Sequence, residues 1–305
     1  MNGVLTGFVT IGVLIGLGAW VAHRGILDLA GGRLLAMLAF NVASPALLLT
    51  TIAKSDPSVL LTTPLLASGI AAGLAMLLYV VPARWWWHED AGSVVVGGFS
   101  TGYVNSANLG IPIATYVLGD AALVAPILLL QLIVIQPIGL AVLDAQAAGA
   151  RPTLLGSLRT IFTNPLTLAT GAGVALALTG WQLPELVASP IQVLAGFAIP
   201  AVLMAYGVSL RLGPGIAATG RARLAYASAV KLIAHPVLAY LSGRLLGLEG
   251  HLLFAVVVLA ALPTAQNVFV IATRYDRATV LTRDTILVTT LGSVPAIALA
   301  AYLLG

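Results

Sequence analysis

Charged residues divide this chain into ten long apolar stretches, and that division constrains its fold more than any other feature. Only 8% of the residues are charged, where a soluble domain carries roughly a quarter. Each stretch has 20 to 29 residues, and about 20 apolar residues span a bilayer core as a helix. The stretches are 1–23, 34–53, 57–83, 91–119, 121–143, 160–184, 186–210, 224–243, 250–273 and 285–305. We therefore predict an all-α integral membrane protein with ten spanning helices and exclude a soluble enzyme.

The apolar residues run continuously, and this pattern favours helices over barrel strands, in which lipid-facing residues alternate with polar ones. The chain has no cysteine, which excludes a disulfide framework, a thiol nucleophile and a zinc–thiolate site. No metal site and no cofactor is predicted. Residues 1–23 lack a basic start and a small-residue cleavage site, so we expect a retained helix and not a signal peptide.

The basic residues are distributed unequally between the connections that join the stretches. Eleven of the fourteen lie in alternate connections: Arg24, Arg33, Arg84, Arg151, Arg159, Arg211, Arg221, Arg223, Arg274, Arg277 and Arg283. Because cytoplasmic connections carry the excess of basic residues, we predict a multi-pass protein of the cell (inner) membrane with both termini outside the cytoplasm. This topology explains the positive net charge, so the expected partners include membrane lipid and no nucleic acid.

Similar segments recur in the two halves of the chain. Residues 12–20 resemble 173–181, residues 43–49 resemble 198–204, and a proline in a polar cluster occurs in the fourth and ninth stretches. We therefore predict a first five-helix repeat over 1–143, a cytoplasmic connecting loop over 144–162 and a second repeat over 163–305. Because five is odd, the second repeat is inverted, which is a recurring plan of secondary transporters.

The fourth and ninth stretches combine proline with amides, hydroxyls and glycine in their middle. Proline breaks the helical hydrogen-bond ladder, so we expect the fourth helix to break near 108–111 and to restart with Pro112 in its first turn, and the ninth to break near Pro263. Each second half-helix then begins inside the membrane with unpaired N–H groups that favour an anion. The candidate substrate-binding residues are Asn105, Ser106, Asn108, Gly110, Pro112, Pro263, Thr264, Gln266 and Asn267. The alternative is a pair of structural proline kinks, which membrane helices tolerate.

Lys231 and His235 are the titratable residues inside the eighth stretch, and their spacing of four puts them on one helix face. No aspartate or glutamate lies inside any stretch, so Lys231 has no acidic partner there. We expect these two residues to give charge support to the site, with the ammonium capping carbonyls of a broken helix or meeting the substrate. The alternative is a lysine that extends to the membrane interface and a histidine that is simply packed.

Five segments carry a resemblance to the auxin efflux carrier family in its short bacterial form, which includes malonate and other organic-acid permeases. They are 40–49, 108–114, 164–171, 231–239 and 262–275. The resemblance implies ten helices in inverted repeats, broken fourth and ninth helices that cross at the substrate site, an elevator-like movement and a homodimer. It also implies that Asn108, Pro112, Pro263, Gln266 and Asn267 face the substrate carboxylate. The chain lacks the long cytoplasmic loop of many plant relatives, so auxin itself is a doubtful substrate.

The resulting hypothesis is a secondary transporter, and not an enzyme, for a small organic anion such as an auxin-like monocarboxylate or a dicarboxylate. One alternative is a sodium-coupled symporter of the bile-acid type, for which an intramembrane glutamate would be expected. Another is an intramembrane enzyme, which would need paired aspartates, a metal-ligand set or a serine–histidine dyad.

Overall fold

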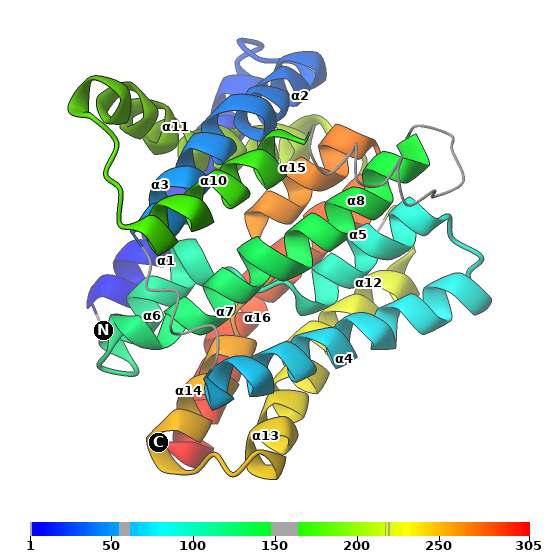
Figure 1. Ribbon diagram of the computed structural model, residues 1–305. Helices are drawn as coiled ribbons and strands as arrows, with labels where there is room; N and C mark the ends of the chain where they lie inside the picture. The colour runs from blue at the N-terminus through cyan, green and yellow to red at the C-terminus, as the bar shows by residue number, and fades with distance from the viewer. Residues whose placement is uncertain (1, 55–61, 148–163, 217, 219) are drawn as a thin grey trace.

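The computed structural model describes residues 2–54, 62–147, 164–216, 218 and 220–305, and these ranges consist of helices joined by loops (Figure 1). The one extended contact in the described chain is an isolated antiparallel bridge between Val104 and Thr264. The prediction of an all-α protein is confirmed.

The helices have these bounds. The first half contains α1 (Asn2–His23), α2 (Leu29–Leu38), α3 (Ser44–Ala53), α4 (Thr63–Trp85), α5 (Ala91–Gly102), α6 (Ile111–Tyr116), α7 (Ala125–Leu130) and α8 (Gln136–Ala147). The second contains α10 (Pro165–Thr179), α11 (Glu185–Leu212), α12 (Arg221–Ala229), α13 (His235–Leu245), α14 (Gly250–Ala260), α15 (Gln266–Tyr275) and α16 (Thr279–Leu304). Short turns join several of them: η1 (Ala39–Ala43), η3 (Ser106–Gly110), η4 (Ala121–Val124), η5 (Gln131–Ile135) and η6 (Val230–Ala234).

Four of these turns, η1, η3, η5 and η6, are π-helical, and each ends two residues before a proline. The prolines are Pro45, Pro112, Pro137 and Pro236. Proline lacks an N–H group, and its ring clashes with the carbonyl four residues earlier. The preceding turn therefore widens from α-helical to π-helical hydrogen bonds. In this way the sequence places an irregular turn within several otherwise apolar helices.

Six helices in the described ranges are long and apolar enough to cross a membrane. They are Leu29–Ala53, Thr63–Trp85, Ala122–Ala147, Glu185–Leu212, Arg221–Leu245 and Thr279–Leu304. Three further apolar helices are shorter: Val9–His23, Pro165–Thr179 and Gly250–Ala260. These features are those of a multi-pass membrane protein, whereas the count of ten spanning helices and their inverted symmetry remain predictions.

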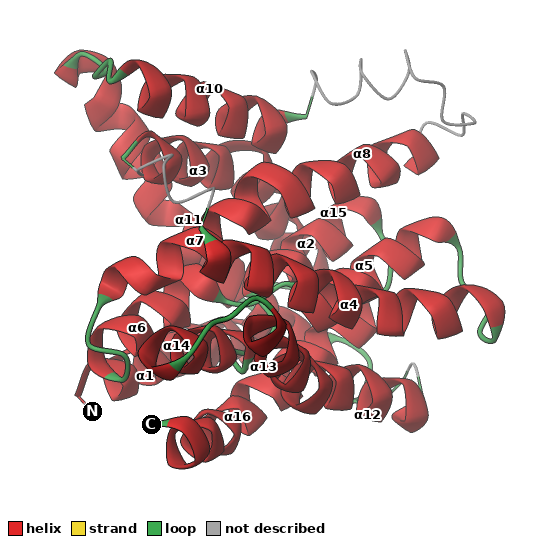
Figure 2. Cartoon of the chain, turned by 60° about the horizontal axis from the view of Figure 1, so that its bottom comes forward, coloured by secondary structure: helices red, strands yellow, loops and turns green. Residues whose placement is uncertain are grey.

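The helices pack as two groups (Figures 1 and 2). The first helix group, at the upper left of Figure 1, consists of α1, α2, α3, α10 and α11, and the remaining helices form the second helix group. Glycine permits the closest packing within the first group, because a side chain at Gly18 would overlap the backbone of Met204 and one at Gly207 would overlap the backbone of Ile15.

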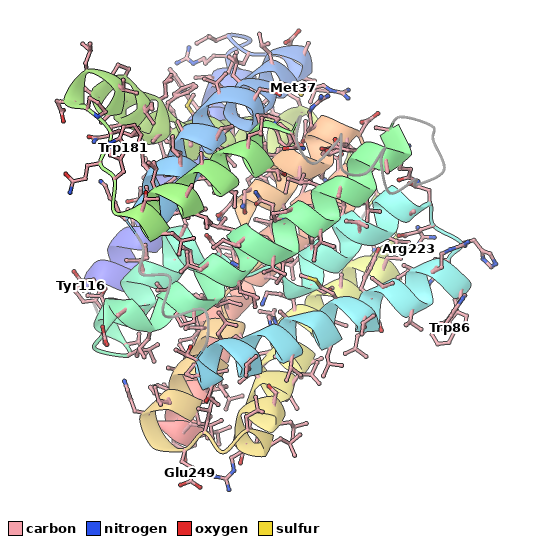
Figure 3. All side chains as sticks on the ribbon, viewed as in Figure 1. Met37, Trp86, Tyr116, Trp181, Arg223 and Glu249 are labelled. Carbon is pink, nitrogen blue, oxygen red and sulfur yellow. The ribbon has the colours of Figure 1, made fainter. Side chains whose placement is uncertain are left out.

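Large aromatic side chains project from the outer parts of the molecule. Trp86, Tyr116 and Trp181 are 75%, 56% and 61% exposed and lie at its periphery in Figure 3. They stand at or near helix ends, where tryptophan and tyrosine are favoured by the membrane interface. Both chain ends lie on the same side of the molecule in Figures 1 and 2.

Candidate functional site

The two interrupted helices meet at their breaks. The main chain of Asn105 donates from N to the carbonyl oxygen of Pro263 at 2.9 Å, and that of Ala265 donates to Tyr103 at 3.2 Å. Together with the bridge from Val104 to Thr264, these bonds form a minimal antiparallel pair. The unwound backbone is therefore hydrogen-bonded where a membrane helix would otherwise leave polar groups unpaired.

The first break lies earlier than the sequence predicts. The expectation was a break near 108–111, but α5 ends at Gly102 and the chain is extended over 103–105. The cause is the π-helical turn η3, which widens the chain before Pro112 and moves the break towards the N-terminus. Pro112 does occupy the first turn of α6, as predicted. In the ninth stretch the break spans 261–265 and includes Pro263, as predicted.

A cavity of about 230 Å³ lies beside this crossing, between the two helix groups. The first group contributes Phe40, Ser44, Leu47, Leu48, Thr51, Leu166, Ala198, Ile199 and Val202. The second contributes Tyr103, Val104, Asn105, Ser106, Ala107, Ile111, Leu128, Leu132, Gln136, Ala265, Gln266, Asn267, Val270 and Ile271. None of these lining residues is charged. Five of the polar ones, Tyr103, Asn105, Ser106, Gln266 and Asn267, lie at the crossing, and Ser44 and Thr51 lie on the wall formed by α3.

Four of the candidate residues from the sequence line this cavity: Asn105, Ser106, Gln266 and Asn267. Asn105 and Gln266 are buried, and the Nδ2 atom of Asn105 donates to Oε1 of Gln266 at 2.7 Å. Asn267 is only partly buried and stands in the first turn of α15. The break thus brings together amides that are separated by about half of the sequence.

Three other candidates hold the crossing without lining the cavity. The carbonyl of Pro263 accepts the hydrogen bond from the main chain of Asn105, and Thr264 donates from Oγ1 to the carbonyl of Ser100 at 2.6 Å. A side chain at Gly110 would come within 2.8 Å of Val124, so glycine allows close packing there. The side chains of Asn108 and Pro112 lie outside the described part of the structure.

Gln131, in η5, is a site residue that the sequence reasoning missed. Its Oε1 accepts from the main-chain N–H of Val104 at 2.6 Å, and its Nε2 donates to the carbonyl of Val104 at 3.1 Å and to Oγ of Ser106 at 2.8 Å. The amide therefore acts as a neighbouring strand would. Because Oγ of Ser106 accepts from Gln131, its own hydrogen remains to donate towards the cavity. The signal was a polar residue in an apolar stretch, which is costly in a membrane unless it is used.

Lys231 lies fully buried in η6 and does not line the cavity. Its Nζ donates to the carbonyl of Ala260 at 2.8 Å and is 3.0 Å from Nδ1 of His235, which is also buried. Ala260 is the last residue of α14, the half-helix before the second break. The side chain thus reaches a helix end and not the membrane interface.

A buried ion pair lies just before the last apolar stretch of the sequence, which begins at residue 285. Helix α16 begins at Thr279, so Arg283 and Asp284 belong to it, and both are almost fully buried. The guanidinium is 2.6 Å from the Asp284 carboxylate and also donates to the carbonyl of Ser209, in the last turn of α11, at 3.0 Å. Helix α16 therefore extends beyond the apolar stretch that the sequence predicts, and includes the pair.

Comparison with known proteins identifies the family of this chain. A family model described as a membrane transport protein matches residues 4–301. A Rhizobium meliloti (strain 1021) protein named "Putative malonate transporter" is 34% identical over 213 residues, which are 68% of this chain and 66% of that relative. Auxin efflux carrier component 1 of Arabidopsis thaliana is 28% identical over 122 residues, 39% of this chain and 20% of the relative. Component 4 is 30% identical over the same shares.

The chain therefore spans just under two thirds of the Rhizobium relative and about a fifth of the plant relatives. The family resemblance that the sequence motifs carry is confirmed, and the comparisons indicate a transporter and not an enzyme.

Proposed function

The chain belongs to the membrane transport protein family, and we propose that it is a secondary transporter of a small organic anion. The cavity at the crossing is the proposed substrate site. The proposal includes ten membrane-spanning helices in inverted five-helix repeats and both termini outside the cytoplasm. A multi-pass membrane protein with its two chain ends on one side is consistent with an even number of crossings.

One observation carries the proposal: a helix N-terminus with an amide side chain faces a cavity inside an apolar protein. α15 begins at Gln266, and both Gln266 and Asn267 line the cavity. The first N–H groups of a helix have no partner within it and carry partial positive charge. An anion is stabilised there without a cationic side chain. The hydroxyl of Ser106 adds a donor from the other broken helix.

The walls of the cavity favour one class of anion. Most of its polar groups are at the crossing, and much of the rest is apolar, including Phe40, Leu166 and Ile271. A carboxylate at the crossing therefore leaves the body of the substrate against apolar side chains. This arrangement suits a monocarboxylate with an apolar body, or a compact dicarboxylate whose two carboxylates both reach the crossing. The Rhizobium relative is named for malonate, which is a compact dicarboxylate, and the plant relatives are named for the efflux of auxin, which is a monocarboxylate with an apolar body.

The position of the cavity between the two helix groups supports alternating access of the elevator type. One wall belongs to the first helix group and carries few polar groups, whereas the crossing belongs entirely to the second. A movement of the second group along the first would carry the bound anion with it. Apolar walls can slide past each other without breaking a fixed set of hydrogen bonds.

The test is a thermal-shift screen of the purified protein against monocarboxylates and dicarboxylates, with sodium or with choline as the cation. A ligand that binds the native state raises the melting temperature as its occupancy rises. Stabilisation by a carboxylate in both salts supports the proposal, and stabilisation that requires sodium would favour the sodium-coupled symporter. No shift with any carboxylate would contradict the site.

Asn267→Ala should reduce affinity for the stabilising carboxylate about tenfold, since a hydrogen bond to a charged group is lost. Asn41→Ala is the matched control, because Asn41 is an exposed asparagine whose amide bonds Met37 within its own helix. Equal affinities in the two variants would place the anion elsewhere.

A further inference from the structure

The hydrogen bonds and ion pairs between the two helix groups in the described chain are confined to one end of the molecule. Asn164, which caps α10 in the first group, bonds Asp144 and Tyr275 of the second. Arg283 of α16 bonds the carbonyl of Ser209 in α11, and Tyr206 of α11 donates to the carbonyl of Arg283 at 2.7 Å. Arg33 and Asp276 form an exposed ion pair at 3.5 Å. This end carries arginines that the sequence predicts to be cytoplasmic.

Asp144, Asn164 and Tyr275 form a closed hydrogen-bonded cluster. Tyr275 donates from its hydroxyl to Oδ1 of Asp144 at 2.6 Å, and Asn164 donates from Nδ2 to Oδ2 of Asp144 at 2.9 Å and to the tyrosine hydroxyl at 3.0 Å. Asn164 also caps α10, because its Oδ1 accepts a hydrogen bond from the main-chain N–H of Leu166. A single amide group, Nδ2 of Asn164, thus makes both hydrogen bonds of the cluster between the two helix groups.

This cluster stands directly beyond one end of the cavity. Leu166 lines the cavity two residues after Asn164, and Ile271 lines it one helical turn before Tyr275. The ring of Tyr275 meets Phe40, a third lining residue, edge to face at 6.0 Å between centroids. A molecule that left the cavity between α10 and α15 would therefore pass this cluster.

The other two contacts between the groups suit a gate less well. The side chains of Arg33 and Asp276 are 56% and 75% exposed, so their ion pair holds the groups together weakly. Arg283 is almost fully buried, and separating it from its carbonyl partners would leave a buried charge without them. In the Asp144–Asn164–Tyr275 cluster, Asn164 is buried but its partners Asp144 and Tyr275 are only partly buried, so water can reach these partners when the cluster opens.

We propose that the Asp144–Asn164–Tyr275 cluster is a gate that closes the cavity on this side in the described state and must open for the cavity to be reached from it. The inference rests on the proposed alternating access. It assigns the described state to the half of the cycle that faces the opposite side.

The test uses labelling of a cysteine, because the chain has none of its own. Ser44→Cys is a conservative reporter that lines the cavity. A membrane-impermeant maleimide applied to vesicles from the side of the 144–159 loop should label it slowly. Tyr275→Phe keeps the ring against Phe40 but removes the hydroxyl. It should make this labelling about tenfold faster, because the loss of one or two hydrogen bonds should raise the population of the open state by about that factor. Tyr302→Phe, at an exposed tyrosine near the end of α16, should leave it unchanged.

A second variant protects the test against misfolding. Asn164→Asp keeps an oxygen that can cap α10 but loses the Nδ2 donor and places a second carboxylate beside Asp144. It should accelerate labelling from the same side. Parental labelling rates in both Tyr275→Phe and Asn164→Asp would overturn the gate. Labelling requires no substrate, so the result stands whether or not a carboxylate is transported.

Discussion

Replacing Lys231 should separate the stability of this protein from its function. Lys231→Met keeps most of the length and the apolar stem of the side chain and removes the ammonium. The carbonyl of Ala260, the end of α14, then loses the donor at 2.8 Å, and the dipole of α14 loses a positive charge at its negative end. We expect the loop over 261–265, which forms the crossing, to lose its fixed position and ligand affinity to fall.

The energies decide the expected sign of the stability change. Leaving a buried carbonyl without a donor costs about 1–3 kcal/mol. Removing an ammonium that is fully buried, with no acid among its hydrogen-bond partners, recovers a desolvation penalty of several kcal/mol. The two effects oppose each other, so Lys231→Met should melt at or above the parental temperature. Lys231→Gln, which keeps a donor but loses the charge, should fall between the parent and Lys231→Met in affinity.

The assay pairs tryptophan-fluorescence melting with the affinity for the stabilising carboxylate and with transport normalised to membrane expression. Lys54→Met is the matched control, because Lys54 is the chain's other lysine and is exposed at the end of α3. We expect a loss of affinity of about tenfold or more in Lys231→Met, which corresponds to one charge-assisted hydrogen bond. Parental affinity and transport in Lys231→Met would refute the reasoning, because the lysine would then be only packed.

Three further predictions address the site, the pH dependence and the packing. Ser106→Ala should lower carboxylate affinity about tenfold in the parent but little in a Gln131→Glu background. A glutamate at position 131 cannot donate to the serine, so the serine hydroxyl would turn its hydrogen to the glutamate and away from the substrate. Equal losses of affinity in the two backgrounds of this double-mutant cycle would contradict the role of Gln131. Burial raises the pKa of the Glu89 carboxyl, so the folded state binds its proton more tightly, and stability should fall as pH rises from about 4.5 through the higher folded-state pKa. Glu89→Gln should flatten that fall in a melting series across pH, and an unchanged slope would show that another group causes it. Gly18→Ala should lower the melting temperature by several degrees because its side chain would overlap another backbone, whereas Gly16→Ala, which meets open space, should not.

The breaks could be predicted from the sequence because their cause is local. Proline disturbs the turn before it in any helix, and the polar residues around Pro263 indicated where a helix could end inside the membrane. The exact residues of the first break could not be predicted, because the π-helical turn before Pro112 depends on how the freed carbonyls find partners. That Val104 would pair with Thr264 could not be predicted either, since a contact across about 160 residues depends on the packing of both helix groups.

Gln131 and the pair of Arg283 and Asp284 could not be placed from the sequence for one physical reason, which is that each has a partner in the main chain of a segment distant in the sequence. Gln131 stood alone in an apolar stretch, and nothing in its neighbours revealed that its partner is the main chain of Val104. In the sequence, Arg283 and Asp284 predict the boundary of a membrane stretch because isolated charges are expelled from lipid. Adjacent opposite charges neutralise each other, and the carbonyl of Ser209 in α11 supplies a further acceptor, so the pair is buried within α16. Charge alone therefore marks the end of a stretch only where no partner is within reach.

The described residues that line the cavity carry no charge. Such a lining suits a carrier better than a lining with a fixed cation. A lysine or arginine in a water-poor cavity would hold a carboxylate strongly, because the low dielectric amplifies their attraction, and release would then limit turnover. The amide of Asn267 and the first turn of α15 supply only partial charges, which favour the anion over water modestly. The positive charge of Lys231 is kept outside the cavity lining, on the carbonyl end of α14, where it can stabilise the crossing without binding the substrate. The fold thus separates the group that holds the site in shape from the groups that must let the anion go.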